Sequence, residues 1–198
     1  MDSLGKQKTL FRLANIVSRL TEPLFWLPVM IWLVVSKVKI PADKQLIYYP
    51  VLLLFIFVIP CVYFLYLIFV KKEFDIDITE RSKRLGFTLK SMISFGIGFI
   101  LSYFMDKELF TITGAVFLSS LSLILVTTRW KISFHGGLNT LTFCTVNYFY
   151  HWRFWWMFLL LIPIGLARII MKKHSPAQFV AGTVLCAVIF WSVTGFLN

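Results

Sequence analysis

The stretch from Ile47 to Val70 contains no charged residue and is long enough to cross a lipid bilayer as a helix. Similar apolar stretches recur along most of the chain. Inside a bilayer every backbone N–H and C=O must be paired within the protein, so only helices and closed barrels can span it. These stretches are too long and too uniformly apolar for barrel strands, which alternate polar and apolar residues. The sequence therefore predicts an all-α fold, a polytopic bundle of transmembrane helices.

The composition agrees with a single membrane-embedded domain over residues 1–198. Hydrophobic residues make up 59% of the chain and charged residues 15%, against about 45–50% and about 25% in ordinary soluble domains. These values exclude a disordered chain, a coiled coil and a typical cytosolic enzyme. We expect six to seven transmembrane helices, because one candidate, 136–150, is short and rich in Thr, Asn and Gly. The expected spans are residues 22–37, 47–70, 88–105, 109–128, 136–150, 155–171 and 177–197.

Basic residues are distributed unevenly along the chain. Residues 1–20 interleave basic and apolar side chains, a pattern typical of an interfacial amphipathic helix. This segment, the loops after the second, fourth and sixth spans, and the span ends that adjoin these loops hold 15 of the 20 Lys and Arg residues. An even number of spans separates these loops, so they share one membrane face, and the positive-inside rule makes that face and the N-terminus cytoplasmic. The cations lie at span ends rather than in a separate basic domain, so no nucleic acid partner is expected.

Acidic residues are missing from the second half of the chain, which has no Asp or Glu after Glu108. The same half contains all three histidines, His135, His151 and His174, beside several Lys and Arg residues. Metal sites built from carboxylates need oxygen ligands that this half lacks. Cations bind phosphoryl oxygens, and imidazole acts as a nucleophile or an acid. We therefore expect a phosphate-bearing ligand, with no metal and no cofactor.

Three short segments on the basic face carry the candidate site residues. In the first, residues 75–84, the i,i+3 spacing of Arg81 and Arg84 places both on one helical face, with Lys83 between them. Taken alone, this segment is more typical of a solvated loop of mixed charge. As part of a site, it supplies cations for a phosphate.

The second segment, residues 131–137, contains Lys131, Ser133 and His135 followed by two glycines. Small residues let the backbone approach a ligand closely, and a helix that begins here would turn free N–H groups toward a phosphate. A juxtamembrane anchor explains the same residues equally well.

The third segment, residues 167–178, places Arg168 at the end of an apolar helix and His174 before the next one. Gln178 lies one helical turn after His174. A basic loop with a snorkelling arginine is the alternative. Because Arg168 is still embedded in the apolar run, the functional interpretation is favoured, since intramembrane cations are usually functional.

Taken together, the three segments resemble the type 2 phosphatidic acid phosphatase superfamily of membrane lipid phosphatases. That family has the pattern K-x6-R-P, then P-S-G-H, then S-R-x5-H-x3-D. Arg84 matches the first arginine, Ser133 and His135 match the second motif, and Arg168 and His174 match the third with its gap intact. The resemblance extends from about residue 71 to the C-terminus.

This sequence departs from the family pattern at six positions. Arg81 or Lys83 would have to replace the missing lysine. The departure that bears most on chemistry is the last position of the third motif, where the family has an acid. The substituted positions are Asp77 for Lys, Leu85 for Pro, Ile132 and Phe134 for the Pro and Gly around Ser133, Ala167 for Ser, and Gln178 for Asp.

The resemblance implies a metal-independent lipid phosphatase that hydrolyses a prenyl phosphate, a prenyl pyrophosphate or a phosphatidate through a phosphohistidine intermediate. His174 would attack the phosphorus and His135 would protonate the leaving oxygen. Cations and backbone amides would hold the remaining oxygens, as in other phosphoryl transfers. The phosphate-binding set comprises Arg84, Arg81, Lys83, Lys131, Ser133 and Arg168.

Two alternatives stay open. Gln178 can accept a hydrogen bond from His174, but it brings no charge to stabilise an imidazolium, unless Asp75 or Asp77 supplies one. The chain would otherwise be a catalytically degenerate protein that binds phospholipid without turnover. An intramembrane prenyltransferase is less favoured, because it needs clustered aspartates for magnesium and only the pair near Asp75 is present. The lipid and the oligomeric state are left open.

Overall fold

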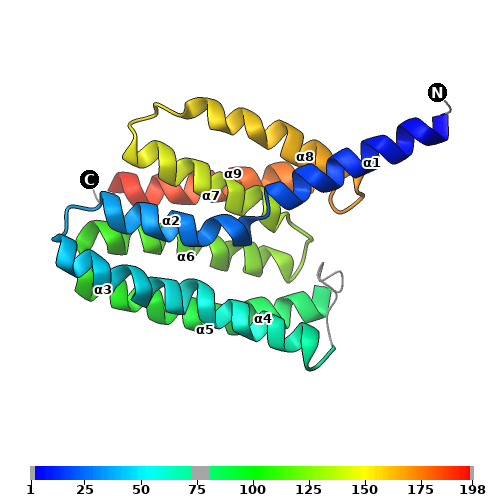
Figure 1. Cartoon of the computed structure of the whole chain (residues 1–198). Helices are drawn as coiled ribbons and strands as arrows, with labels where there is room; N and C mark the ends of the chain where they lie inside the picture. The colour runs from blue at the N-terminus through cyan, green and yellow to red at the C-terminus, as the bar shows by residue number, and fades with distance from the viewer. Residues whose placement is uncertain (1–2, 73–80, 197–198) are drawn as a thin grey trace.

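The computed structural model describes residues 3–72 and 81–196, with side chains for residues 5–72 and 85–195. The described part contains helices and connections but no strand, which confirms the predicted all-α fold. Figure 1 shows the helices lying side by side, with α1 extending beyond one end of the bundle. In order, the elements are α1 (Ser3–Leu20), α2 (Pro23–Lys37), α3 (Ala42–Leu53), η1 (Leu54–Val58), α4 (Ile59–Phe69), α5 (Arg81–Met105), α6 (Lys107–Thr127), α7 (Phe134–Phe149), η2 (Trp155–Leu160), α8 (Leu161–Ile170) and α9 (Pro176–Phe196).

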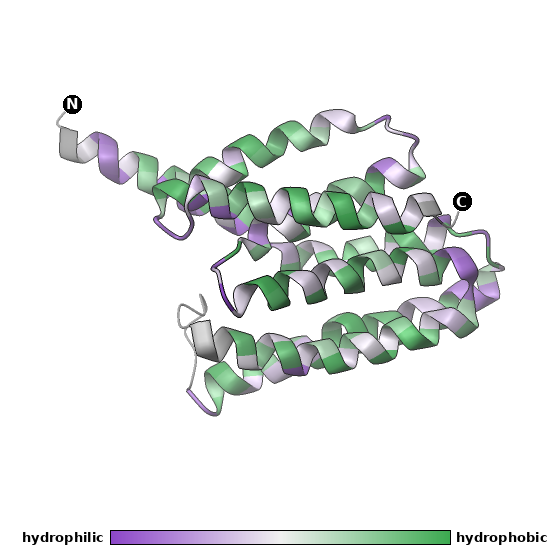
Figure 2. Cartoon of the chain, turned by 180° about the vertical axis from the view of Figure 1, so that it is seen from behind, coloured by the Kyte–Doolittle hydropathy of each residue, from purple (hydrophilic) through white to green (hydrophobic). Residues whose placement is uncertain are grey.

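Five helical segments in the described residues are long and apolar enough to cross a membrane, which marks the chain as a membrane protein. They are Gly5–Lys37, Ala42–Phe69, Leu85–Met105, Lys107–Thr127 and Pro176–Gly195. Figure 2 shows hydrophobic residues along the helices and many of the hydrophilic ones at their ends and in α1.

The expected count of six to seven spans is not confirmed, for a reason of length. The segment expected at 136–150 is α7, which has 16 residues and a length of about 24 Å, less than the hydrocarbon thickness of about 30 Å. The segment expected at 155–171 corresponds to the short apolar helix Trp155–Ile170. The region expected to be a separate interfacial helix, residues 1–20, forms α1 and continues into α2 after Thr21 and Glu22.

Several helix boundaries follow from local chemistry. Pro23 and Pro176 are the first residues of α2 and α9, where the missing N–H and the fixed φ are favourable. Asp106 caps α6, because its side chain accepts hydrogen bonds from the N–H groups of Glu108 at 2.8 Å and Leu109 at 3.1 Å. The chain therefore turns sharply between α5 and α6, and these two helices form an antiparallel pair.

The core lies where α6, α7 and α9 pack together. Leu123, Cys144, Cys186 and Phe190 are fully buried there. Gly137 makes this packing possible, since a Cβ at that position would lie 2.7 Å from Cys186 Sγ. Close packing of α7 on α9 fixes the ends of both helices relative to each other, and those ends carry candidate site residues.

Candidate active site

The candidate segments end up at one end of the bundle. The helices of the pairs α5–α6 and α7–α8 are antiparallel. The first residues of α5, α7 and α9 and the last residues of α8 therefore lie at the same end of the bundle (Figure 1). Backbone hydrogen bonds join two of these segments, because Ser133 N–H donates to the Gln178 carbonyl at 3.1 Å. The second and third segments are therefore adjacent in space, as a shared phosphate site requires.

The start of α7 is built around Ser133. Its side chain caps the helix by accepting a hydrogen bond from Gly136 N–H at 3.1 Å. On the other side, Gly182 of α9 lies so close that a Cβ there would collide with the Ser133 carbonyl oxygen. His135 consequently occupies the first turn of α7, at the positive end of the helix dipole, and only 6% of it is exposed.

His135 is held by the junction between α1 and α2. Its Nε2 lies 3.3 Å from the Thr21 hydroxyl oxygen, and its Nδ1 lies 3.8 Å from a Glu22 carboxylate oxygen. The Thr21 hydroxyl donates its single proton to the Val17 carbonyl at 2.8 Å, so it can only accept from His135. Nε2 is therefore the donor in this contact, and the Glu22 carboxylate lies on the Nδ1 side of the ring.

Asn139 fixes the same junction to α7. Its side-chain amide donates to the Thr21 carbonyl at 2.9 Å and to the His135 carbonyl at 2.8 Å. Asn139 is 4% exposed, and buried hydrogen bonds of this kind are costly to lose because the partner groups stay buried. The position of Glu22 relative to His135 is thus set by the fold.

Arg168 contacts the last turn of α1, one turn before Thr21. Its Nη1 donates to Ser18 Oγ at 2.8 Å, and Ser18 is 3% exposed. Ser18 and Thr21 are three residues apart, the spacing at which helical side chains are neighbours. The arginine of the third segment and the histidine of the second therefore meet on one short stretch of chain near residue 20.

His174 lies at the connection between α8 and α9 and is 9% exposed. Its backbone N–H and that of Lys173 donate to the Arg168 carbonyl, at 3.4 and 3.0 Å. This turn keeps His174 next to the end of α8. The Arg-x5-His spacing thus corresponds to a closed turn that joins the two residues through the backbone.

Gln178 serves as part of a helix cap. Its side-chain oxygen accepts from Ser175 N–H at 3.0 Å, and its own N–H donates to Ser175 Oγ at 3.3 Å. This reciprocal pair is a capping box. The amide oxygen expected to orient His174 is bonded to Ser175 instead.

Of the other expected site residues, the structure describes the side chain of Lys131 alone. Lys131 is exposed, at the connection before α7. Arg81, Lys83 and Arg84 lie in the first turn of α5, and their side chains are outside the described set. Asp75 and Asp77 also lie outside the described residues.

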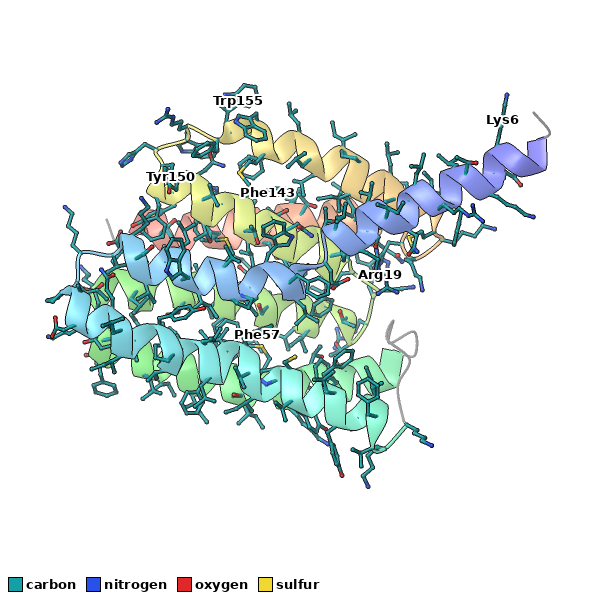
Figure 3. The ribbon with its side chains drawn as sticks, viewed as in Figure 1. Lys6, Arg19, Phe57, Phe143, Tyr150 and Trp155 are labelled. Carbon is teal, nitrogen blue, oxygen red and sulfur yellow. The ribbon has the colours of Figure 1, made fainter. Side chains whose placement is uncertain are left out.

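Four residues of this site were not predicted from the sequence, namely Ser18, Thr21, Glu22 and Asn139. Thr21-Glu22-Pro23 was readable as a helix start, and Asn139 lies one turn after His135 on a largely apolar helix. His151, in contrast, is exposed and follows Tyr150, and Figure 3 shows Tyr150 and Trp155 at the end of the bundle opposite Arg19.

Fold and site together define a multi-helix membrane protein in which a buried imidazole lies near a half-buried guanidinium and a half-buried carboxylate at one end of the bundle. Comparisons of the chain with models of protein families, with curated proteins and with solved structures give no match.

Proposed function

We propose that the chain is an integral-membrane lipid phosphatase that works without a metal ion. The observation that carries this proposal is the meeting of His135 and Arg168 on consecutive turns near residue 20, at distances of 3.3 Å and 2.8 Å from Thr21 and Ser18. A proton donor and a guanidinium that contact neighbouring side chains of one short segment, at the end of an apolar bundle, suit a phosphate whose lipid part stays in the membrane. His174 is joined to Arg168 through the backbone.

The proposed reaction has two steps. An imidazole nitrogen of His174 attacks the phosphorus with its lone pair, and the bond from phosphorus to the lipid oxygen breaks as the N–P bond forms. His135 gives its Nε2 proton to the leaving oxygen, which replaces the Thr21 hydroxyl at that atom. In the second step water attacks the phosphohistidine, His135 takes the proton, and inorganic phosphate leaves.

Cations neutralise the charge that accumulates on the phosphoryl oxygens. Arg168 supplies one of them, and Arg81 and Arg84 lie in the turn of α5 at the same end of the bundle. The N–H groups of the first turn of α7 add partial positive charge.

Glu22 supplies the negative charge that Gln178 does not. In histidine relays a carboxylate holds the imidazole in the correct orientation and stabilises its cation. Glu22 stands in that relation to His135. The carboxylate therefore supports the general acid rather than the nucleophile.

Phosphate release tests the proposal. Purified protein in detergent, with a chelator present, is expected to release phosphate from at least one of a prenyl phosphate, a prenyl pyrophosphate and a phosphatidate. The matched control is His174→Ala. If none of the three substrates gives phosphate above this control, the proposed activity is wrong.

A lipid-phosphate binder without turnover is the second candidate. The engagement of Gln178 in a helix cap favours it, because no carboxylate is then assigned to His174. This candidate predicts that the lipid phosphates bind to the wild-type protein and to His174→Ala equally, with no phosphate released by either.

We further propose that α7 and the η2–α8 segment cross the membrane as a hairpin, which together with the five long segments gives seven crossings, within the expected range of six to seven. The site would then lie on the cytoplasmic face together with the N-terminus, as the excess of basic residues there predicts.

A further inference from the structure

An apolar cleft of about 230 Å³ lies inside the bundle and begins beside the site. Pro23, which follows Glu22, and Phe134, which precedes His135, both line it. Phe87 of α5 lines it as well, one turn after the position of Arg84. The cleft therefore begins where the candidate phosphate-binding residues gather.

The cleft opens sideways, between two groups of helices. One wall consists of α2 and α7, α6 forms the floor, and the other wall is mostly α5, with single residues from α3, η1 and α4 (Leu52, Ile56 and Pro60). Among the described residues, α2 packs on α3, η1, α6 and α7 but makes no packing contact with α4 or α5. In a membrane this open side faces the lipid, so a hydrocarbon chain can enter without passing through water.

The surface of the cleft is mostly apolar. Three of the hydroxyl groups along it donate to carbonyls of their own helices, Thr88 to Leu85, Thr113 to Leu109 and Thr142 to Leu138. The other lining side chains are mostly aliphatic or aromatic. The buried Ser91 hydroxyl has no hydrogen-bond partner among the described residues, but the rest of the lining offers little to a polar ligand and suits hydrocarbon.

The cleft is long and narrow. Its lining on α6 extends from Leu109 to Ile124, about 22 Å at the rise of an α-helix. Half of the hydrocarbon core is only about 15 Å thick, so the cleft continues past the midplane, where the chains of a lipid in one leaflet end. Its volume exceeds the about 150 Å³ that encloses one benzene, but spread over this length it leaves room for one chain.

We infer that this cleft binds the hydrocarbon chain of the substrate, and that the substrate is a single-chain lipid phosphate of the prenyl type rather than a two-chain phosphatidate. The inference rests on the proposed phosphatase function for its headgroup chemistry. The cleft itself is independent of that function.

Cleft-filling variants test the inference. Val116 lies half-buried in the floor of the cleft, while Leu118 on the same helix is 42% exposed on the outer surface. Rates are measured with geranylgeranyl phosphate, dioleoyl phosphatidate and the water-soluble ester phenyl phosphate. For Val116→Phe we expect at least a tenfold loss on geranylgeranyl phosphate and an unchanged rate on phenyl phosphate, whereas Leu118→Phe should behave as wild type.

Wild-type protein is also expected to prefer geranylgeranyl phosphate over dioleoyl phosphatidate at least tenfold in kcat/KM. Equal use of the two lipids, or an unaltered prenyl rate in Val116→Phe, overturns the inference. If Val116→Phe also loses phenyl phosphate activity, Thr142→Leu in the α7 wall of the cleft replaces it, with the same expected outcome.

A binding experiment separates this inference from the proposed function. A geranylgeranyl phosphate analogue with a photoreactive chain is cross-linked to the His174→Ala protein, and the labelled peptides are identified by mass spectrometry. Labels on the cleft-lining residues of α6 and α7, such as Val116 and Thr142, are expected with or without turnover by the wild type. Labels only on outward-facing residues such as Leu118 overturn the cleft assignment even if phosphate is released.

Discussion

At the scale of single residues, the proposed acid His135 has a carboxylate partner from a distant part of the chain. Glu22 lies 3.8 Å from Nδ1 while Thr21 accepts at Nε2. A neutral amide at position 22 would keep the size of the side chain but remove the negative charge beside the ring.

We predict that Glu22→Gln lowers kcat by about tenfold to a hundredfold, within the range that general acid catalysis contributes. KM should change little, because Glu22 contacts His135 and not the substrate. Steady-state phosphate release measures both, and Glu22→Asp should restore part of kcat. A kcat equal to that of the wild type in Glu22→Gln would contradict the assigned role.

Asn139 is the residue that fixes the junction. Asn139→Leu leaves the Thr21 and His135 carbonyls without their amide donor, and we expect a loss of about 1–3 kcal/mol in unfolding free energy. Thermal unfolding in detergent measures it, with Thr142→Val on an adjacent turn of α7 as the control. Equal melting temperatures for the two variants would show that the junction does not depend on Asn139.

At the scale of elements, the contact between α7 and α9 positions the site. Gly182→Ala would push a methyl group into the Ser133 carbonyl, whereas Gly195→Ala on the same helix meets nothing within 4 Å. We expect Gly182→Ala to cost about 1–3 kcal/mol, as overpacking does, and to reduce turnover. Gly195→Ala should match the wild type in thermal unfolding and in activity. Equal melting temperatures and equal activities for the two variants would show that the close contact of Gly182 with Ser133 does not position the site.

The first turn of α9 depends on the capping box of Ser175 and Gln178. Gln178→Ala removes one half of the box, and we expect a local loss of about 0.5–2 kcal/mol, visible as faster hydrogen exchange at the first amides of α9. Turnover should stay within about threefold of wild type, since a residue outside the chemistry makes no differential contribution. A large fall in kcat without faster exchange would instead support a relay role for Gln178.

At the scale of the whole molecule, the uneven distribution of basic residues predicts the membrane orientation. Ser175 lies beside the site and His151 at the opposite end, and both are exposed. With the native cysteines replaced, we expect an impermeant maleimide to label His151→Cys in intact cells and Ser175→Cys only after permeabilisation. The reverse pattern would place the site on the outer face and contradict the charge rule.

The sequence predicted the helical fold and most helix positions because apolar runs of this length have few other solutions in a bilayer. The third span was predicted to begin at residue 88, whereas α5 begins at Arg81. The first turns of α5 contain polar residues, so the apolar pattern does not reveal them. The partners of His135 could not be predicted, because Thr21 is 114 residues away. The capping role of Gln178 was readable from its spacing to Ser175.

The central claim is that His174 becomes phosphorylated during hydrolysis of a lipid phosphate. Rapid-quench mixing of purified protein with prenyl phosphate labelled at phosphorus, followed by peptide mapping, measures this directly. We predict an acid-labile label on the peptide containing His174, formed without added metal and absent from His174→Ala. Phosphate release with no protein-bound label, or a label on another residue, would contradict the account.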